Sequence, residues 1–318
     1  MKTIRQRFSL FFASLALAAS VPTVAWAAAP FNDIDGSFAE QDIQNLYKNQ
    51  VIQGYEDGKF RPDAPITRAE FATMLVKAKH FPVPDGVQDI FRDVPRGEWF
   101  APYVELSYRL GVTSGVDGNK FAPNDLLTRE QMVRMTVNAL GRDSEVARRL
   151  SYSAYSTAIR GYLDKAEISS WAVKQVAYAV QQGLITGAYA RLHPQDNATR
   201  AEVAAILNRS ILSRPKGQGL VPVSRGSLNY HSKQEAKATA YTYSGQPSYI
   251  GLQEREGLIA VDPQQIPLGS HLFVPGYGYG IAGDTGGNIK SARVDLFMPS
   301  YRQAIDFGVR NVNVFVLD

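Results

Sequence analysis

The 318-residue sequence contains no cysteine and only four histidines. The missing cysteines exclude disulfides and thiolate metal sites, so stability must come from core packing alone. The histidines are scattered without metal-ligand spacing, and we predict no metal and no cofactor. An excess of one charge is also missing. Without the three basic residues at the N-terminus, 31 basic residues face 30 acidic ones. A balance of this kind gives no electrostatic footprint for nucleic acid.

Long apolar runs are absent after the first 28 residues. Within those residues Lys2, Arg5 and Arg7 precede an apolar stretch, and Ala25-Trp26-Ala27 fits a small-x-small cleavage site. This pattern predicts a secretory signal peptide over residues 1–28, and so a secreted protein with no membrane segment after cleavage. A retained membrane anchor is the alternative, which Pro22 disfavours because it interrupts the run.

A repeat occupies the first two thirds of the chain. Its closing segments are Thr67-Arg68-Ala69-Glu70, Thr128-Arg129-Glu130-Gln131 and Thr199-Arg200-Ala201-Glu202. Each unit opens with an aromatic residue two positions before an Asp, and these aromatic residues stand 36, 37 and 37 positions before the closing Thr: Phe31, Phe91 and Tyr162. A unit of this size cannot bury its own apolar face, so neighbouring units must share a core.

The interior of each unit predicts two helices joined by a tight turn. The first helix is amphipathic, and the second buries Phe71, Met74, Leu75 and Ala78 in the first unit. Between the helices lie a Gly-rich turn, an apolar residue and a Pro, as in Gly54-Tyr-Glu-Asp-Gly58 followed by Phe60 and Pro62. Calcium binding by these turns is disfavoured, because the ligand spacing of an EF-hand is absent.

The closing segment combines a structural and a functional signal. Thr followed three residues later by Glu70, Gln131 or Glu202 is a capping box, which explains these residues without any ligand. The Arg is different, because a cation in the first helical turn opposes the helix dipole. Three Arg at equivalent positions indicate recognition of an anion. The alternative is a solvated Arg or a link to a nearby carboxylate.

Together the aromatic-x-Asp opening, the Gly-x-x-Asp-Gly turn and the Thr-Arg-Ala-Glu closure resemble tandem S-layer homology domains, over residues 29–88, 89–150 and 160–212. The resemblance implies an α-helical pseudo-threefold bundle that anchors the protein to a secondary cell-wall polysaccharide, often one bearing pyruvate ketals. It also implies that Arg68, Arg129 and Arg200 contact this polymer, since a guanidinium pairs bidentately with a carboxylate. The third turn departs from the pattern, because Gly187-Ala-Tyr lacks the Asp-Gly pair.

The last third of the chain divides into two parts. Residues 213–234 are rich in Ser, Arg, Lys, Gly and Pro and predict an exposed linker. Residues 235–318 read as six short strands with a brief helix from Ser300 to Phe307, which predicts a small closed all-β barrel. In this part Asp262 ends one strand, Asp284 ends the next and opens Thr-Gly-Gly, and Asp295 lies within a strand on the face opposite its apolar neighbours.

These motifs resemble the three-aspartate ("3D") domain, a double-psi β-barrel of wall-active proteins, and the catalytic core of the membrane-bound lytic transglycosylase A family. The resemblance implies cleavage of the bond between N-acetylmuramic acid and N-acetylglucosamine in peptidoglycan, giving a 1,6-anhydro product. It implies that Asp295 is the acid/base, with a pKa raised by burial and by neighbouring carboxylates. Asp284 and Asp262 would position the substrate, and the implied sugar contacts are Thr239, Tyr241, Thr242, Thr285, Gly286, Gly287 and Lys290.

The residues themselves leave alternatives open. Asp before Pro263 and Asp before Thr285 are ordinary turn residues, whereas Asp295 is unusual because Asp is depleted from strands. An aspartic protease is disfavoured, since only one Asp-Thr-Gly is present. We therefore predict a secreted, cell-wall-anchored enzyme that cuts peptidoglycan. The alternatives are a protein that binds the wall without cleaving it and a structural subunit of an S-layer.

Overall fold

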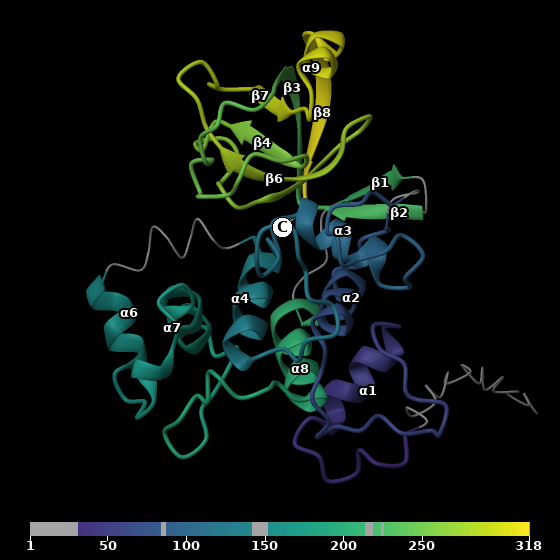
Figure 1. The fold of residues 1–318 in the computed structure, drawn as a ribbon, viewed down its shortest axis with the longest axis vertical. Coiled ribbons are helices and arrows are strands. Elements are labelled where there is room, and N and C mark those ends of the chain that lie inside the picture. Colours follow the sequence, from purple (N-terminus) through teal and green to yellow (C-terminus); the bar gives the residue numbers. More distant parts are fainter. Residues whose placement is uncertain (1–30, 84–86, 142–151, 214–218, 224–225, 318) are drawn as a thin grey trace, which may run out of the picture.

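The computed structural model describes residues 31–83, 87–141, 152–213, 219–223 and 226–317, and Figure 1 shows a helical region below a β-barrel. The predicted signal peptide lies outside these residues. None of the helices within the described ranges has both the length and the apolar character needed to cross a membrane.

The helices follow the repeat. The first unit contains α1 (Glu40–Lys48) and α2 (Arg68–Ala78), and the second contains α3 (Ala101–Arg109) and α4 (Arg129–Ala139). Helix α6 (Tyr152–Ile159) precedes the third unit, which contains α7 (Val173–Gln181) and α8 (Arg200–Leu207). A 3-10 turn at Lys165–Glu167 precedes α7, and a π-helical segment at Asn208–Leu212 extends α8. Thr67, Thr128 and Thr199 cap α2, α4 and α8 in complete capping boxes. This confirms the structural explanation of the Thr and of its Glu or Gln partner.

The three units close into a ring. The backbone N–H of Ile66 donates to the carbonyl of Ala198 at 3.1 Å, that of Ala198 to Leu127 at 2.8 Å, and that of Leu127 to Ile66 at 2.9 Å. All three side chains are fully buried. The residues just before the closing helices therefore meet at the centre, and the predicted pseudo-threefold bundle is confirmed.

The Asp that opens each unit fixes the turn between the two helices. The Asp93 carboxylate accepts the backbone N–H groups of Phe121 and Ala122, both at 2.8 Å. Asp33 in the first unit and Asp164 in the third accept the two equivalent backbone N–H groups of their own units. Ala122 has φ of 58°, in the left-handed region, so the carboxylate holds a backbone shape that this residue rarely adopts alone.

Six strands form a closed mixed barrel, as predicted for the C-terminal part. They are β3 (Ser232–Tyr241), β4 (Leu258–Val261), β5 (His271–Val274), β6 (Gly278–Asp284), β7 (Arg293–Phe297) and β8 (Arg310–Val316), in the order β3-β7-β4-β6-β5-β8. The pairs β3–β7 and β4–β6 are parallel and the other four are antiparallel. Helix α9 (Tyr301–Phe307) confirms the brief helix.

The segment predicted as an exposed linker contains a β-hairpin instead. Strands β1 (Gly219–Val223) and β2 (Gly226–Tyr230) pair antiparallel, and Leu228 is only 1% exposed. Alternation of apolar and polar residues was too short here to stand out against the Gly, Ser and Pro content. Figure 1 draws the hairpin below the barrel, at the level of α3.

An aromatic series joins the hairpin, the barrel and the bundle. Tyr230 contacts Phe315, Phe315 contacts Phe273, Phe273 contacts Tyr279 and Tyr279 contacts Phe81, with ring centroids 5.0, 6.4, 5.2 and 6.0 Å apart. The Tyr279 hydroxyl also donates to the carbonyl of Pro82 at 2.9 Å. Buried aromatic contacts of this kind hold the barrel against the bundle.

Polar groups complete the same interface. Arg109 at the end of α3 forms ion pairs with Glu105 at 2.9 Å and with Glu256 of the barrel at 3.0 Å. The guanidinium of Arg255 lies over the ring of Tyr108, 4.0 Å from its centroid. A Cβ on Gly257 would lie 2.7 Å from the carbonyl oxygen of Arg109, so only glycine permits this approach of β4 to α3.

Candidate functional site

The three repeated Arg side chains link one unit to the next. The Nε of Arg68 donates to the carbonyl of Phe121 at 2.9 Å, that of Arg129 to Leu192 at 2.8 Å and that of Arg200 to Phe60 at 2.8 Å. Each bond runs to the next unit around the ring. The Arg therefore has a structural role that sequence spacing did not reveal.

The Nη1 atom of each of these Arg side chains lies near the Glu or Gln of the capping box in the next unit, and here the three sites differ. Arg129 forms an ion pair with Glu202, and Arg200 lies 3.6 Å from Glu70. Arg68 meets the uncharged Gln131, with Nη1 and Oε1 3.5 Å apart. Burial lowers the pKa of Arg68, and the charges of Asp125 and Asp93 oppose this shift. Among the described residues no ion pair with a carboxylate is found for Arg68.

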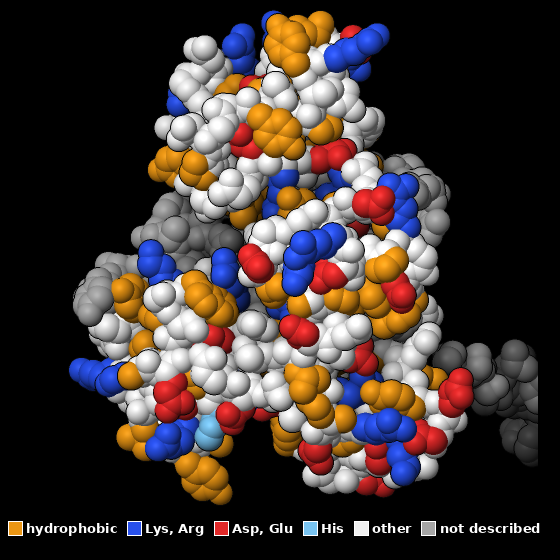
Figure 2. Space-filling view, viewed as in Figure 1, with side chains coloured by type: hydrophobic (Ala, Val, Ile, Leu, Met, Phe, Trp, Pro, Cys, Tyr) orange, Lys and Arg blue, Asp and Glu red, His pale blue; other side chains and the backbone are white. Residues whose placement is uncertain are grey.

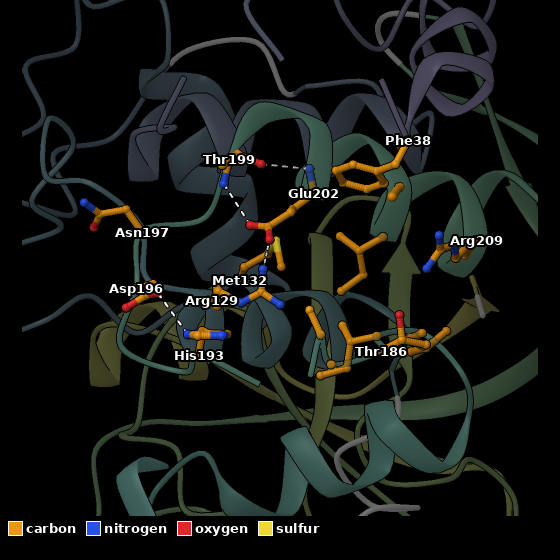
Figure 3. A pocket seen from close by; sticks show the side chains of 16 residues that line it. Phe38, Arg129, Met132, Thr186, His193, Asp196, Asn197, Thr199, Glu202 and Arg209 are labelled. Atoms are coloured by element: carbon orange, nitrogen blue, oxygen red, sulfur yellow. Dashed lines mark hydrogen bonds and ion pairs between the residues drawn. The ribbon is translucent and has the colours of Figure 1, made fainter. Parts of the chain in front are cut away.

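Cavities open beside two of these Arg side chains. Figure 3 shows Arg129 pointing at Glu202 in a cavity of about 470 Å³ that also takes in Thr186 and Gly187 of the third turn. That turn frames a cavity although it lacks the Asp-Gly pair. A second cavity of about 330 Å³ contains Arg68, Gln131, Arg134 and Trp171. The guanidinium of Arg134 stacks over the Trp171 ring at 5.0 Å.

In the barrel, strand register brings two of the three predicted Asp together. Ala260 of β4 pairs with Asp284 of β6 on one side and with Asp295 of β7 on the other. Both Asp are register partners of Ala260, with a register shift in β6 just before Asp284, and the charge of Asp284 acts on Asp295, so the two carboxyl groups lie near the same side of β4. Two strand spacings separate their backbones by about 10 Å. Thr239 of β3 continues the row beside Asp295.

Asp295 has an environment that raises its pKa above the ordinary value of a carboxyl group. Burial raises its pKa and the charge of Asp284 raises it further, while the hydrogen bond from Thr239, 2.8 Å long, lowers it. Asp284 accepts the backbone N–H groups of Tyr249 and Thr285 with the same oxygen, Oδ1, at 3.0 and 2.8 Å. No hydrogen-bond partner for its other oxygen, Oδ2, is found among the described residues.

Asp262 belongs to a different arrangement. Its two oxygens accept the backbone N–H groups of Gln264 at 3.0 Å and Ser291 at 2.7 Å. These bonds and the charge of Lys290 lower its pKa. Asp262 therefore ties the turn after β4 to the loop before β7, which favours the structural interpretation for this residue.

Of the other predicted sugar contacts, Tyr241 and Thr285 lie beside the Asp284–Asp295 pair, whereas Lys290 lies near Asp262. Tyr241 lies near both carboxylates, its hydroxyl is buried without a hydrogen-bond partner, and burial raises its pKa. Thr242 follows it and is half-buried, as are Thr285 and Gly286, while Gly287 and Lys290 are exposed. A Cβ on Gly287 would meet nothing within 4 Å, so packing does not require glycine there.

Sequence reasoning missed two tyrosines in the loop between β3 and β4. Tyr249 is 71% exposed and its backbone holds Asp284, and Tyr243 is 61% exposed and stacks against Phe297 at 4.9 Å. The carboxylate of Glu254 stabilises this loop by accepting the N–H groups of Ser244 and Gly245. Aromatic residues in an otherwise polar Gly-Pro loop were the available signal.

Comparisons with known proteins agree with this division of the chain. The S-layer homology domain family matches residues 30–72, 90–133 and 161–204, and the 3D domain family matches residues 257–318. Exoglucanase XynX of Acetivibrio thermocellus is 32% identical over 62% of this chain and 17% of its own length. The surface-layer 125 kDa protein of Lysinibacillus sphaericus is 28% identical over 74% of this chain and 20% of its own.

S-layer protein sap of Bacillus anthracis is 27% identical over 61% of this chain and 23% of its own length. The chain thus spans less than a quarter of each of these three relatives. A solved undecaheme cytochrome from the S-layer of Carboxydothermus ferrireducens is 18% identical over 48% of this chain and 22% of its own. Its TM-score of 0.27 is too low to establish a common fold.

The chain therefore consists of three S-layer homology domains followed by a C-terminal 3D domain. A protein of this class lies at the cell surface, anchored through its S-layer homology domains as S-layer proteins are.

Proposed function

We propose that the barrel is a peptidoglycan lytic transglycosylase and that the bundle holds it to the cell wall. The observation that carries the catalytic part is the pairing of Asp295 and Asp284 across Ala260. Asp295 is partly buried, and its burial and the nearby carboxylate of Asp284 raise its pKa, which suits a group that donates a proton.

In the proposed reaction Asp295 acts first as acid and then as base. Its proton passes to the oxygen between N-acetylmuramic acid and N-acetylglucosamine, and the bond from the anomeric carbon to that oxygen breaks. The C6 hydroxyl of the muramyl sugar attacks the same carbon and returns its proton to Asp295. The carboxyl group is regenerated, no water is consumed, and the product is a 1,6-anhydro sugar.

The surroundings of the pair suit a carbohydrate. Tyr243 and Tyr249 offer exposed rings on which sugar faces can pack, and the open space at Gly287 lets a chain approach the backbone. The buried hydroxyl of Tyr241 is a donor beside the two carboxylates. We assign sugar contacts to these groups and to Thr239, Thr242, Thr285, Gly286 and Lys290.

Digestion of purified peptidoglycan by the full chain tests the reaction. Mass spectrometry should find anhydro-muropeptides with the wild type, and Asp295→Asn should lower their yield at least about a hundredfold. Asp306→Asn, which changes an exposed aspartate on α9, is the matched control and should leave the yield unchanged. If the wild type releases no anhydro product, the transglycosylase assignment is refuted.

For the anchor, we propose that an acidic secondary cell-wall polysaccharide binds beside the repeated Arg, and chiefly in the cavity of Arg68. A second cation, Arg134, and the ring of Trp171 line the same cavity, and Gln131 stands where the other two units have a carboxylate. A pyruvate ketal carboxylate can pair with the guanidinium of Arg68, which makes no ion pair with a carboxylate among the described residues. Arg129 and Arg200 are proposed as weaker contacts, because Glu202 and Glu70 compete for them.

A reciprocal exchange tests this assignment without disturbing the capping boxes. Gln131→Glu puts a carboxylate in front of Arg68, as in the other units, and should weaken co-sedimentation with pyruvylated walls. Glu202→Gln removes the carboxylate in front of Arg129 and should strengthen it. The double variant Arg68→Ala with Arg129→Ala should lose binding. Co-sedimentation that is equal for all these variants, with circular dichroism like the wild type, would rule out anchoring through the Arg side chains.

A further inference from the structure

A cleft of about 850 Å³ separates the barrel from the second and third units of the bundle. One wall comes from α4 and α7 and includes Arg134, Lys174 and Gln175. The other wall comes from the barrel and includes Tyr249, Thr285 and Lys290. Figure 2 shows Lys and Arg side chains where the barrel meets the helical region. This volume extends beyond the residues assigned to the anchor and to the catalytic pair, because Lys174, Gln175 and Gln264 line it as well.

The cleft continues the cavity of Arg68. Ser114, Arg134 and Asn138 line both spaces. At its other end Thr285 and Tyr249 are the residues whose backbone N–H groups hold Asp284. The described residues therefore outline a path from Arg68 on the bundle, past Arg134, to the edge of the candidate catalytic pair.

The lining chemistry fits a chain that carries both hydroxyl and carboxylate groups. Lys174 and Lys290 bring exposed positive charge from opposite walls. Among the described residues that line the cleft, Asp262 is the one carboxylate, and it already accepts two backbone N–H groups. The Oε1 of Gln175 is buried and has no hydrogen-bond partner, so it is an acceptor that a sugar hydroxyl can satisfy.

The two walls are held in fixed relation. The ion pair of Arg109 with Glu256, the bond from Tyr279 to Pro82 and the aromatic series through Phe81 all lie in the interface between barrel and bundle. A binding site formed by two such walls is organised before the ligand arrives, which lowers the ordering cost of binding.

We propose that the cleft binds an anionic glycan chain that contacts the bundle and the barrel at the same time. This proposal rests on the proposed function only in taking a wall glycan as the ligand. The bundle is then part of the binding site of the barrel, and it guides the polymer towards Asp284 and Asp295. Two glycans have the required chemistry: acidic wall polysaccharide, and peptidoglycan strands whose peptides have been removed to leave lactyl carboxylates.

Binding can be read from within the cleft because the chain has no natural cysteine. The full chain with Gln264→Cys, labelled with an environment-sensitive dye, is titrated separately with released acidic wall polysaccharide and with amidase-treated glycan strands. Lys174→Glu and Lys290→Glu each reverse one charge, on opposite walls. Lys165→Glu on the bundle and Arg302→Glu on the barrel are matched controls, since both side chains are exposed and neither lines the cleft.

For a glycan that spans the cleft, each cleft variant should raise the dissociation constant about three- to tenfold, and the controls should change it less than about twofold. The glycan that shows this pattern is the ligand. If either cleft variant binds both glycans as the controls do, the spanning site is refuted. The anchor and the reaction are tested separately by Gln131→Glu and Asp295→Asn, so their failure would not be confused with failure of the cleft.

Discussion

Replacing Arg200 by Ala should destabilise the helical bundle whether or not a ligand binds there. The side chain is only 6% exposed, and its Nε donates to the carbonyl of Phe60 at 2.8 Å. The guanidinium lies 4.6 Å from the centroid of the Phe60 ring and 5.0 Å from that of Tyr55, and its Nη1 lies 3.6 Å from Glu70. All of these contacts join the third unit to the first and close the ring.

The magnitude follows from these contacts. Loss of a charged hydrogen bond that leaves a buried carbonyl unsatisfied costs about 1.5–3 kcal/mol. Loss of the ring stacking adds about 0.5–1 kcal/mol, and loss of the partly exposed ion pair adds at most about 1 kcal/mol. The free energy of unfolding should therefore fall by about 2–5 kcal/mol, a large share of the 5–15 kcal/mol or so that holds a typical domain.

Urea and thermal unfolding of the full chain, followed by circular dichroism at 222 nm or so, measure this change. The melting temperature of Arg200→Ala should fall by about 5–15 °C. Arg200→Lys keeps the stem and the charge but not the planar fork, and should lose about half as much. Arg92→Ala, at an exposed position of the second unit, should stay within about 0.5 kcal/mol of the wild type. If Arg200→Ala unfolds at the same temperature and urea concentration as Arg92→Ala, the contacts of Arg200 do not stabilise the bundle and our reasoning is refuted.

Three further predictions concern the catalytic pair, the turns and the domain interface. Because the proposed reaction needs protonated Asp295, cleavage should decline as pH rises through the raised pKa of this residue. Thr239→Val removes a hydrogen bond that lowers this pKa, so the decline in a pH–rate profile should move to higher pH. Asp284→Asn removes a charge that raises this pKa, so the decline should move to lower pH. Shifts in the same direction would contradict the assignment. Asp93→Ala leaves two backbone N–H groups without their acceptor and should lower the free energy of unfolding in urea by about 2–4 kcal/mol. Gly257→Ala puts a Cβ against the backbone of α3 and should split the calorimetric unfolding of barrel and bundle into two transitions, while a single unchanged transition would show that the contact is not needed.

Much of this protein could be predicted from local signals in the sequence. The capping box depends on residues three positions apart, so Thr67 and Glu70 predicted the start of their helix from the sequence alone. Short runs of β-favouring residues between turn residues predicted the strands of the barrel. The unusual Asp295, in a strand between two buried apolar residues, also stood out by its position alone.

The features that only the tertiary structure decided are contacts between residues far apart in the chain. Arg200 bonds to Phe60, 140 residues away, and no spacing rule predicts such a partner. Asp284 and Asp295 both pair with Ala260 because their strands flank β4 in the barrel, which the order of strands along the chain does not give. The sequence by itself thus determined the units, their caps and the candidate acid. Packing of the units against one another and against the barrel decided what surrounds each Arg and Asp, because charge, burial and cavities arise only when distant segments meet.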